Sequence, residues 1–188
     1  MTGGAVIRRW SKVADATAVT ARETLQRALG LGKRVRGVAR SEVFSFGWNG
    51  VLPAAPAALE TLARDTNLIL NPNKHHRELV HGTEPLHPTG NAWVLVFEPG
   101  QGKELGGAIN RRRLLPFPLA GVRSAVLWEL DLEGDAGQIR AATLLAAETR
   151  NRRQGLLANP HFQTCRIMEA VPTAQSVQAA LWEGDTAQ

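Results

Sequence analysis

The fold is decided by the stretch VRSAVLWELDLE at residues 122–133. Apolar and acidic side chains alternate along its second half, which is the period of a β-strand with one apolar and one polar face. The apolar positions are Val126, Trp128, Leu130 and Leu132, and the acidic ones are Glu129, Asp131 and Glu133. We therefore expect a long strand here, with its apolar face under helices and its acidic face in water.

A similar stretch lies earlier in the chain, VRGVARSEVFSF at residues 35–46. The shared Val-Arg pair is displaced by 87 residues, from Val35 to Val122, and a shared Asn-Pro pair by 88, from Asn71 to Asn159. Solenoid and propeller repeats are shorter, roughly 20–50 residues. We therefore expect two copies of one small domain.

Each copy is predicted to have the element order β-α-β-α-β. In the first copy, we expect strands at 5–10, 35–46 and 67–70 and helices at 16–29 and 54–64. In the second, we expect strands at 91–98, 122–133 and 161–170 and helices at 103–115 and 136–154. The expected domains are a first unit at 1–82, a linker at 83–90, a second unit at 91–170 and a C-terminal appendage at 171–188.

The two long strands differ in phase. The first-copy positions that match the apolar face of the second copy are Ala39, Ser41, Val43 and Ser45. Phe44 and Phe46 therefore fall on the opposite side. Either a bulge shifts the first strand, or both of its faces are covered. We expect the second arrangement, with both phenylalanines buried against the other unit's sheet or a second chain.

The composition indicates a soluble globular protein, with 44% hydrophobic residues. No apolar run approaches the roughly 18 residues of a membrane span, and the chain start lacks a signal-peptide pattern. Cys165 is the only cysteine, so no internal disulfide can form. We expect a cytoplasmic protein.

The charge pattern leaves a binding module of another class as an alternative. The net charge is +5, and the basic clusters are Lys33-Arg34-Val35-Arg36, Arg111-Arg112-Arg113 and Arg150-Asn151-Arg152-Arg153. Such clusters bind nucleic-acid phosphates or oppose the dipole at helix ends. A His-rich segment, with His75, His76, His81 and His87 beside Glu78 and Glu84, could hold a metal or small ligand. Adjacent His75 and His76 point to opposite faces of a strand, which disfavours one metal site.

Several short motifs resemble those of the small PurS subunit of bacterial phosphoribosylformylglycinamidine synthase. The motifs are Gly121-Val122-Arg123, Glu129-Leu130 and Leu157-Ala158-Asn159-Pro160, with a looser match at Pro99-Gly100-Gln101-Gly102. The resemblance covers residues 91–170 well and 5–79 more weakly. The family's Gly-Lys pair after Val-Arg is replaced here by Ala125-Val126 and by Val38-Ala39. Two units in one chain look like the N-terminal domain of the single-chain large synthase.

The resemblance implies an α+β fold of two tandem βαβαβ PurS-like units related by a pseudo-twofold axis, with their sheets packed together and helices outside. It also implies a non-catalytic subunit of de novo purine biosynthesis that docks a synthetase to a glutaminase and helps ammonia transfer. The synthetase and glutaminase subunits would be its partners, and it could form homo-oligomers. Membrane binding is not expected, and nucleic acid is a less favoured partner.

The candidate partner- or ligand-binding residues are Asn71, Asn73, Lys74, His75, Gln101, Arg123 and Asn159. The first four could contact a phosphate or a partner. The Asn-Pro pairs are also expected to form structural turns. Glu42 and Glu129 are expected on a face that meets water or the other unit, in structural ion pairs with Arg36 or Arg123. No catalytic residue, cofactor or metal ligand is predicted, and Cys165 is not expected to be a nucleophile.

Overall fold

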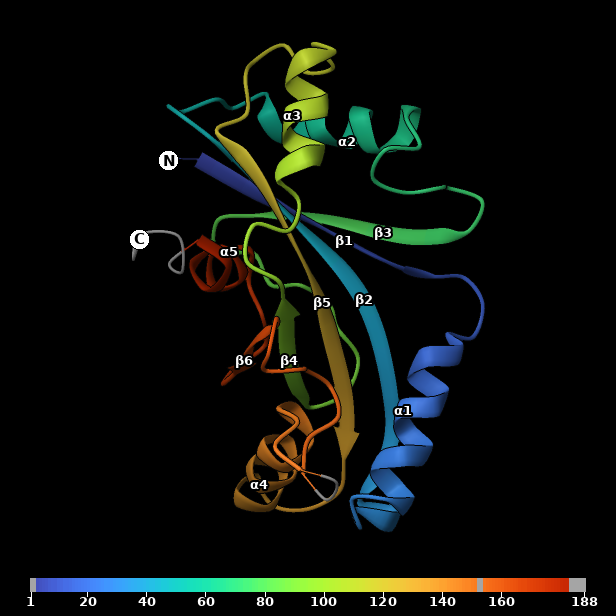
Figure 1. Cartoon of the computed structure of the whole chain (residues 1–188). Coiled ribbons are helices and arrows are strands. Elements are labelled where there is room, and N and C mark those ends of the chain that lie inside the picture. Colours follow the sequence, from blue (N-terminus) through green and yellow to red (C-terminus); the bar gives the residue numbers. More distant parts are fainter. Residues whose placement is uncertain (1–2, 152–153, 183–188) are drawn as a thin grey trace.

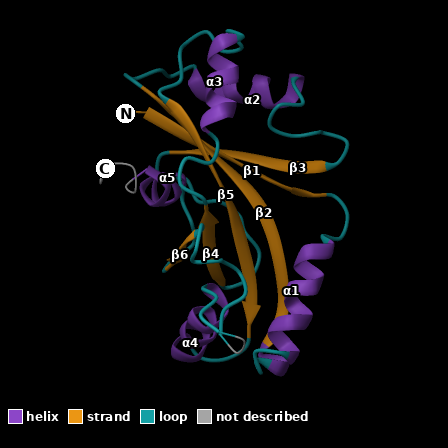
Figure 2. Cartoon of the chain, viewed as in Figure 1, coloured by secondary structure: helices purple, strands orange, loops and turns teal. Residues whose placement is uncertain are grey.

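The computed structural model describes residues 3–151 and 154–182. Within these residues, one six-stranded antiparallel sheet combines with five α-helices (Figures 1 and 2). The prediction of a mixed α+β fold is thereby confirmed. None of the described helices is long and apolar enough to cross a membrane.

The elements follow one another in the predicted order. The first half contains β1 (Gly3–Ser11), α1 (Ala16–Arg27), a 3-10 turn η1 (Gly32–Arg34), β2 (Val35–Trp48), α2 (Ala55–Asp65) and β3 (His75–His81). The second half contains β4 (Ala92–Phe97), α3 (Lys103–Arg111), β5 (Gly121–Leu132), α4 (Ala136–Ala147) and β6 (Thr164–Met168). The chain then forms α5 (Ala174–Trp182).

The two halves share one sheet with the strand order β3-β1-β2-β5-β4-β6. The long strands β2 and β5 pair at its centre, from Val35 opposite Leu132 to Gly47 opposite Gly121. The expected arrangement of two sheets packed face to face is therefore wrong. Pairing edge to edge satisfies main-chain groups that stacked sheets would leave exposed along both long strands.

Helices pack on both faces of the sheet and form an apolar core on each. On one face, α2 and α3 cover one end of the sheet and α1 and α4 cover the other, forming two apolar clusters (Figure 1). On the opposite face, α5 covers the centre through Ala174, Val177 and Leu181. The segment expected to be an appendage thus contributes to the core.

A bulge in β2 explains the difference in phase between the long strands. Its register with β5 shifts between Val35 and Gly37, and one extra residue turns every later side chain to the other face. Phe44 and Phe46 consequently share a face with Trp128. The phenylalanines are buried, as expected, but helices α2 and α3 cover them rather than a second sheet or chain.

Three other predicted elements differ from the structure. Helix α3 ends at Arg111 rather than at 115. The strand expected at 67–70 is absent, because Ile69 and Leu70 instead insert as buried loop residues into the core beside α2. The strand of this region, β3, begins only after the Asn-Pro turn. Helix α4 ends at Ala147 rather than at 154, because the chain turns extended at Glu148 and forms a bridge with Ala158.

Helix α3 approaches β5 closely through a glycine. A Cβ atom on Gly106 would lie 3.1 Å from the backbone nitrogen of Val122 and 3.2 Å from its side chain. The Gly-Gly pair weakens the helix by propensity. However, Gly106 lets α3 pack closely on β5, and Ile109 of α3 is fully buried in the core beneath the helix.

Replacement of Phe46 by alanine tests this core. Phe46 is fully buried, so Phe46→Ala should lower the free energy of unfolding by about 3–5 kcal/mol. The matched control is Phe162→Ala, because Phe162 is 55% exposed and should change stability by about 0.5 kcal/mol or less. Urea denaturation of both variants measures the difference. Similar losses for the two would contradict the placement of Phe46 under the helices.

Candidate functional site

A cluster of buried charged side chains crosses four adjacent strands on the α5 face of the sheet. The Arg8 cluster consists of Arg8 (β1), Ser41 (β2), Glu78 (β3) and Glu129 (β5). Arg8 donates to Glu129 Oε1 at 2.7 Å, to Glu78 Oε1 at 2.9 Å and to Ser41 Oγ at 2.9 Å. Ser41 Oγ also donates to Glu129 Oε1 at 2.7 Å. The cluster therefore joins the two halves of the chain.

The chain segment that connects the two halves covers this cluster. Thr89 donates its backbone N–H and its hydroxyl to Glu129 Oε2, at 2.6 and 2.9 Å. The His87 carbonyl accepts from Arg8 at 3.2 Å. As a result Glu129 is only 2% exposed. Glu129 therefore lies between the two halves, which is one of its two expected positions, and not in water, because Arg8 and the linker cover its side of β5.

Glu42 and Glu129 form ion pairs, as expected, but their arginine partners differ from the expected ones. Glu129 pairs with Arg8 and Glu42 pairs with Arg9, whose Nη2 lies 2.6 Å from a Glu42 oxygen. Arg36, an expected partner of Glu42, instead pairs with Glu133. The sequence signal that would have revealed the cluster is the Arg8-Arg9 pair directly after the apolar run of β1, because adjacent strand residues point to opposite faces and both faces of this sheet are covered.

Every polar atom of the Glu129 carboxylate and of the Arg8 guanidinium has a hydrogen-bond partner within the protein. Each oxygen of the Glu129 carboxylate accepts two hydrogen bonds, and all three nitrogens of the Arg8 guanidinium donate. The carboxylate and the guanidinium are thus bound to partners within the protein. The cluster therefore acts as a rigid clamp between strands.

The two Asn-Pro turns use the same hydrogen bonds. The Asn71 side chain accepts from the Asn73 N–H at 2.9 Å, and the Asn71 N–H donates to His75 Nδ1 at 3.1 Å. The Asn159 side chain accepts from the His161 N–H at 3.1 Å, and the Asn159 N–H donates to the Gln163 side chain at 3.0 Å. Both asparagines thus build turns that lead into an edge strand, as expected.

The seven candidate residues fall into three places. Asn71, Asn73, Lys74 and His75 belong to the turn before β3, and Asn159 to the turn before β6. Because β3 and β6 are opposite edges of the sheet, the structure does not bring these turns together.

Gln101 and Arg123 are brought together at the start of α3. The Gln101 carbonyl accepts from the Ser124 N–H at 3.0 Å, and Arg123 lies 4.5 Å from the centre of the Trp182 ring. Arg123 also lines a small cavity of about 120 Å³ with Arg166 and Thr164.

The histidines of the His-rich segment contact separate groups. His75 and His76 occupy successive positions of β3, opposite Ser11 and Trp10, so they point to opposite faces as expected. His76 stacks on Trp10, whereas His81 and His87 contact Glu84 and Glu78. Across residues 3–151 and 154–182, no group of three or more His, Cys, Asp or Glu side chains is placed to hold a metal.

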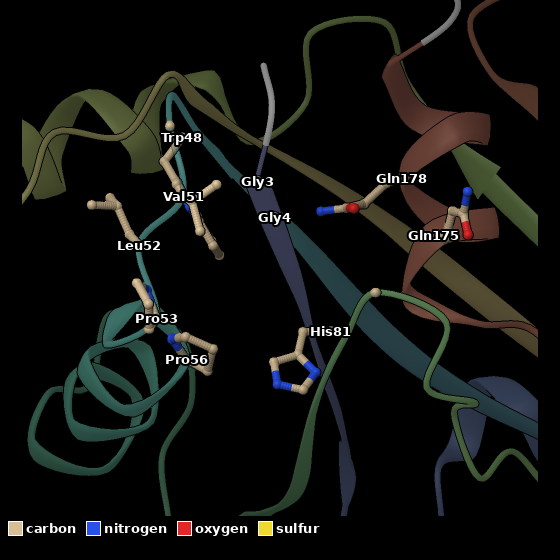
Figure 3. Close-up of a pocket in the computed structure, with 12 residues that line it drawn as sticks. Gly3, Gly4, Trp48, Val51, Leu52, Pro53, Pro56, His81, Gln175 and Gln178 are labelled. Atoms are coloured by element: carbon tan, nitrogen blue, oxygen red, sulfur yellow. The ribbon is translucent and has the colours of Figure 1, made fainter.

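An open cleft of about 470 Å³ lies at the N-terminal end of β1 (Figure 3). Gly3 and Gly4 form its floor, and Gln175 and Gln178 of α5 line one side. The opposite side is apolar, with Trp48, Val51, Leu52, Pro53 and Pro56. A Cβ atom on Gly3 would lie 2.3 Å from the Trp48 indole nitrogen, and one on Gly4 would lie 1.8 Å from the Gln178 amide nitrogen, so a side chain at either position would displace its neighbour.

A second cavity, of about 350 Å³, opens beside β2 where the pairing of β2 with β1 has ended. We name it the β2-edge cavity. Its polar lining includes Arg40 and Asp15, whose Nε–Oδ2 distance is 2.9 Å, together with Glu129 and Arg8 at its base. Burial alone raises the pKa of Asp15. The charge and hydrogen bond of Arg40, with two backbone N–H donors of α1, outweigh that effect and hold the pKa below its usual value.

Cys165 lies on β6, opposite Val96 of β4. Burial raises the pKa of its thiol, and the charge of nearby Glu148 raises it further. A thiolate is therefore disfavoured at neutral pH, consistent with the expectation that Cys165 is not a nucleophile.

Comparison with known proteins finds no protein-family model that matches the chain and no curated protein that matches it.

The Arg8 cluster yields a stability prediction. Glu129→Gln removes one charge of a buried pair and leaves the Arg8 guanidinium undercompensated, which should cost about 3–5 kcal/mol of unfolding free energy. The control is Glu133→Gln, which breaks the exposed pair with Arg36 and should cost about 1 kcal/mol or less. Chemical denaturation of both variants provides the comparison. An equal effect would mean that the Arg8 cluster is not a buried clamp.

The Cys165 thiol yields a pH prediction. Its pKa is raised, so the midpoint of its alkylation rate against pH should lie above that of a free cysteine. Glu148→Gln should shift the midpoint to lower pH, because the nearby negative charge is removed. Iodoacetamide kinetics from pH 7 to about 10 measure both midpoints. A midpoint that is unchanged in Glu148→Gln would contradict this electrostatic effect.

Proposed function

We propose that this chain is a non-catalytic, duplicated PurS-like subunit of a glutamine-dependent phosphoribosylformylglycinamidine synthase. In this role it docks the synthetase to the glutaminase and helps ammonia pass between them in de novo purine biosynthesis. The observation that carries the proposal is the joining of two β-α-β-α-β halves through their long strands into one sheet.

Support for a duplication comes from three independent features. The strand order reads β3-β1-β2 from one edge and β6-β4-β5 from the other, so corresponding strands occupy corresponding places. The two Asn-Pro turns repeat the same hydrogen bonds with different side chains. After the bulge that follows Val35, the large apolar side chains of β2 lie on the same face of the sheet as those of β5. We propose that a pseudo-twofold axis passes between β2 and β5, near Ser41 and Leu127.

Support for the synthase role comes from the motifs and their positions. The Val-Arg pairs lie at the starts of the central strands and the Asn-Pro pairs precede the edge strands, so each motif occupies an equivalent place in both halves. In the proposed subunit, the first half takes the place of the second chain of a PurS dimer. A scaffold of this kind needs surfaces for partners and no catalytic centre of its own.

The test is reconstitution with the synthetase and glutaminase subunits of the same cell. The three proteins should co-purify, and amidation driven by glutamine should fall when this chain is left out. Amidation driven by added ammonium should persist, because ammonia from solution bypasses the glutaminase. Absence of a complex, together with unchanged glutamine-dependent activity, would remove the proposal.

The second candidate is a binding module that takes a small ligand. It is favoured by the cleft in Figure 3, which His81 of the His-rich segment lines together with the α5 amides. A ligand of this cleft should raise the melting temperature of the isolated chain. A nucleic-acid ligand is distinguished by affinity that falls steeply with salt concentration.

A further inference from the structure

We propose that the β2-edge cavity binds a small carboxylic acid with an apolar body, whose carboxylate is held by Arg40. This inference does not rest on the proposed function, because it concerns binding of a small molecule by the isolated chain. The cavity, of about 350 Å³, is at the lower end of the roughly 300–1,000 Å³ typical of small-molecule sites.

The cavity exists because the two neighbouring strands have different lengths. Pairing between β1 and β2 stops at Arg9 opposite Glu42, and Trp10 and Ser11 of β1 remain paired only with β3 before the chain turns into α1. Strand β2 continues through Arg40, Ala39 and Val38, paired only with β5 on its other side. This part of β2 thus has an open edge that faces the cavity, and such an edge offers main-chain hydrogen-bonding groups to a ligand.

Arg40 supplies the recognition group. Its Nε donates to Asp15, and its guanidinium lies 6.0 Å from the centre of the Trp128 ring, which orients the planar group. Its two terminal nitrogens have no hydrogen-bond partner among the residues that the structure describes, and the side chain is 30% exposed. A carboxylate fits this fork with two parallel hydrogen bonds.

The molecule itself contains an example of one guanidinium shared by two carboxylates. Arg8 binds Glu78 through Nη1 and Glu129 through Nη2. Arg40 has one protein carboxylate, Asp15, on Nε, so its terminal fork can take a second from a ligand. The Arg8 cluster at the base of the cavity has its donors already engaged, which leaves Arg40 as the group that selects an anion.

The rim of the cavity indicates the apolar part of the ligand. Val13 is 76% exposed and Val19 is 44% exposed, and both line the cavity together with Trp10. Exposed β-branched side chains beside a concave surface gain free energy when a ligand covers them. A branched aliphatic or aromatic acid of amino-acid size would contact them while its carboxylate reaches Arg40.

Calorimetric titration of the full chain with 4-methylpentanoate, its uncharged amide and L-leucine tests the proposal. We expect saturable binding of one acid per chain, with the amide at least about tenfold weaker because it cannot form the charge-assisted pair. Tighter binding of L-leucine identifies the ligand as an amino acid, and tighter binding of 4-methylpentanoate identifies a simple acid. Absence of saturable binding by both would overturn the proposal.

Two variants and one control locate the site. Arg40→Met should remove the preference for acid over amide, whereas Val13→Ser at the exposed rim should weaken the acid and the amide alike. Arg22→Met removes one charge from an exposed position on α1 that does not line the cavity, so affinity should stay unchanged. The site would be contradicted if Arg22→Met weakened acid binding as much as Arg40→Met. It would also be contradicted if neither Arg40→Met nor Val13→Ser altered acid binding. Chemical shifts of the Trp10 indole provide a readout that does not depend on stability.

Discussion

The buried pair between Arg8 and Glu129 is the constraint on which the arrangement of the two halves depends. It reaches across β2, with Ser41 bonded to both partners, and Thr89 of the connecting segment completes it. A buried ion pair adds little net stability compared with apolar packing, but a misplaced one is costly. A slip of one residue between β2 and β5 would turn Glu129 to the helical face, away from Arg8. The pair therefore selects one register.

That register makes the halves mutually dependent. Phe46 from the first half lies in the same apolar cluster as Ile109 of α3 from the second, and Leu25 of α1 shares a cluster with Leu130 of β5. Each end of the sheet is consequently covered by one helix from each half. Neither half therefore contains a complete core within its own residues.

The polar groups that could bind a ligand lie in surface cavities and not among the buried charges. The interior charges of the Arg8 cluster are satisfied by one another, so they hold the strands rather than meet a ligand. The open features are the cleft at the start of β1 (Figure 3) and the β2-edge cavity, where Arg40 keeps part of its guanidinium available. Such a distribution suits a protein that binds ligands at its surface.

Local sequence patterns were sufficient to predict the order of the elements. The alternation after Val122 predicted β5, Asp135 correctly marked the start of α4, and the Asn-Pro pairs predicted turns, because each signal acts within a few residues of the chain. The faces of β2 were decided only by tertiary structure, since the bulge at the Val35–Gly37 step appears only in its pairing with β5. The burial of Glu129 was likewise hidden, because its partner is 121 residues away along the chain. Alternation and capping are encoded within one segment, whereas register, burial and charge pairing arise between segments that the sequence does not place side by side.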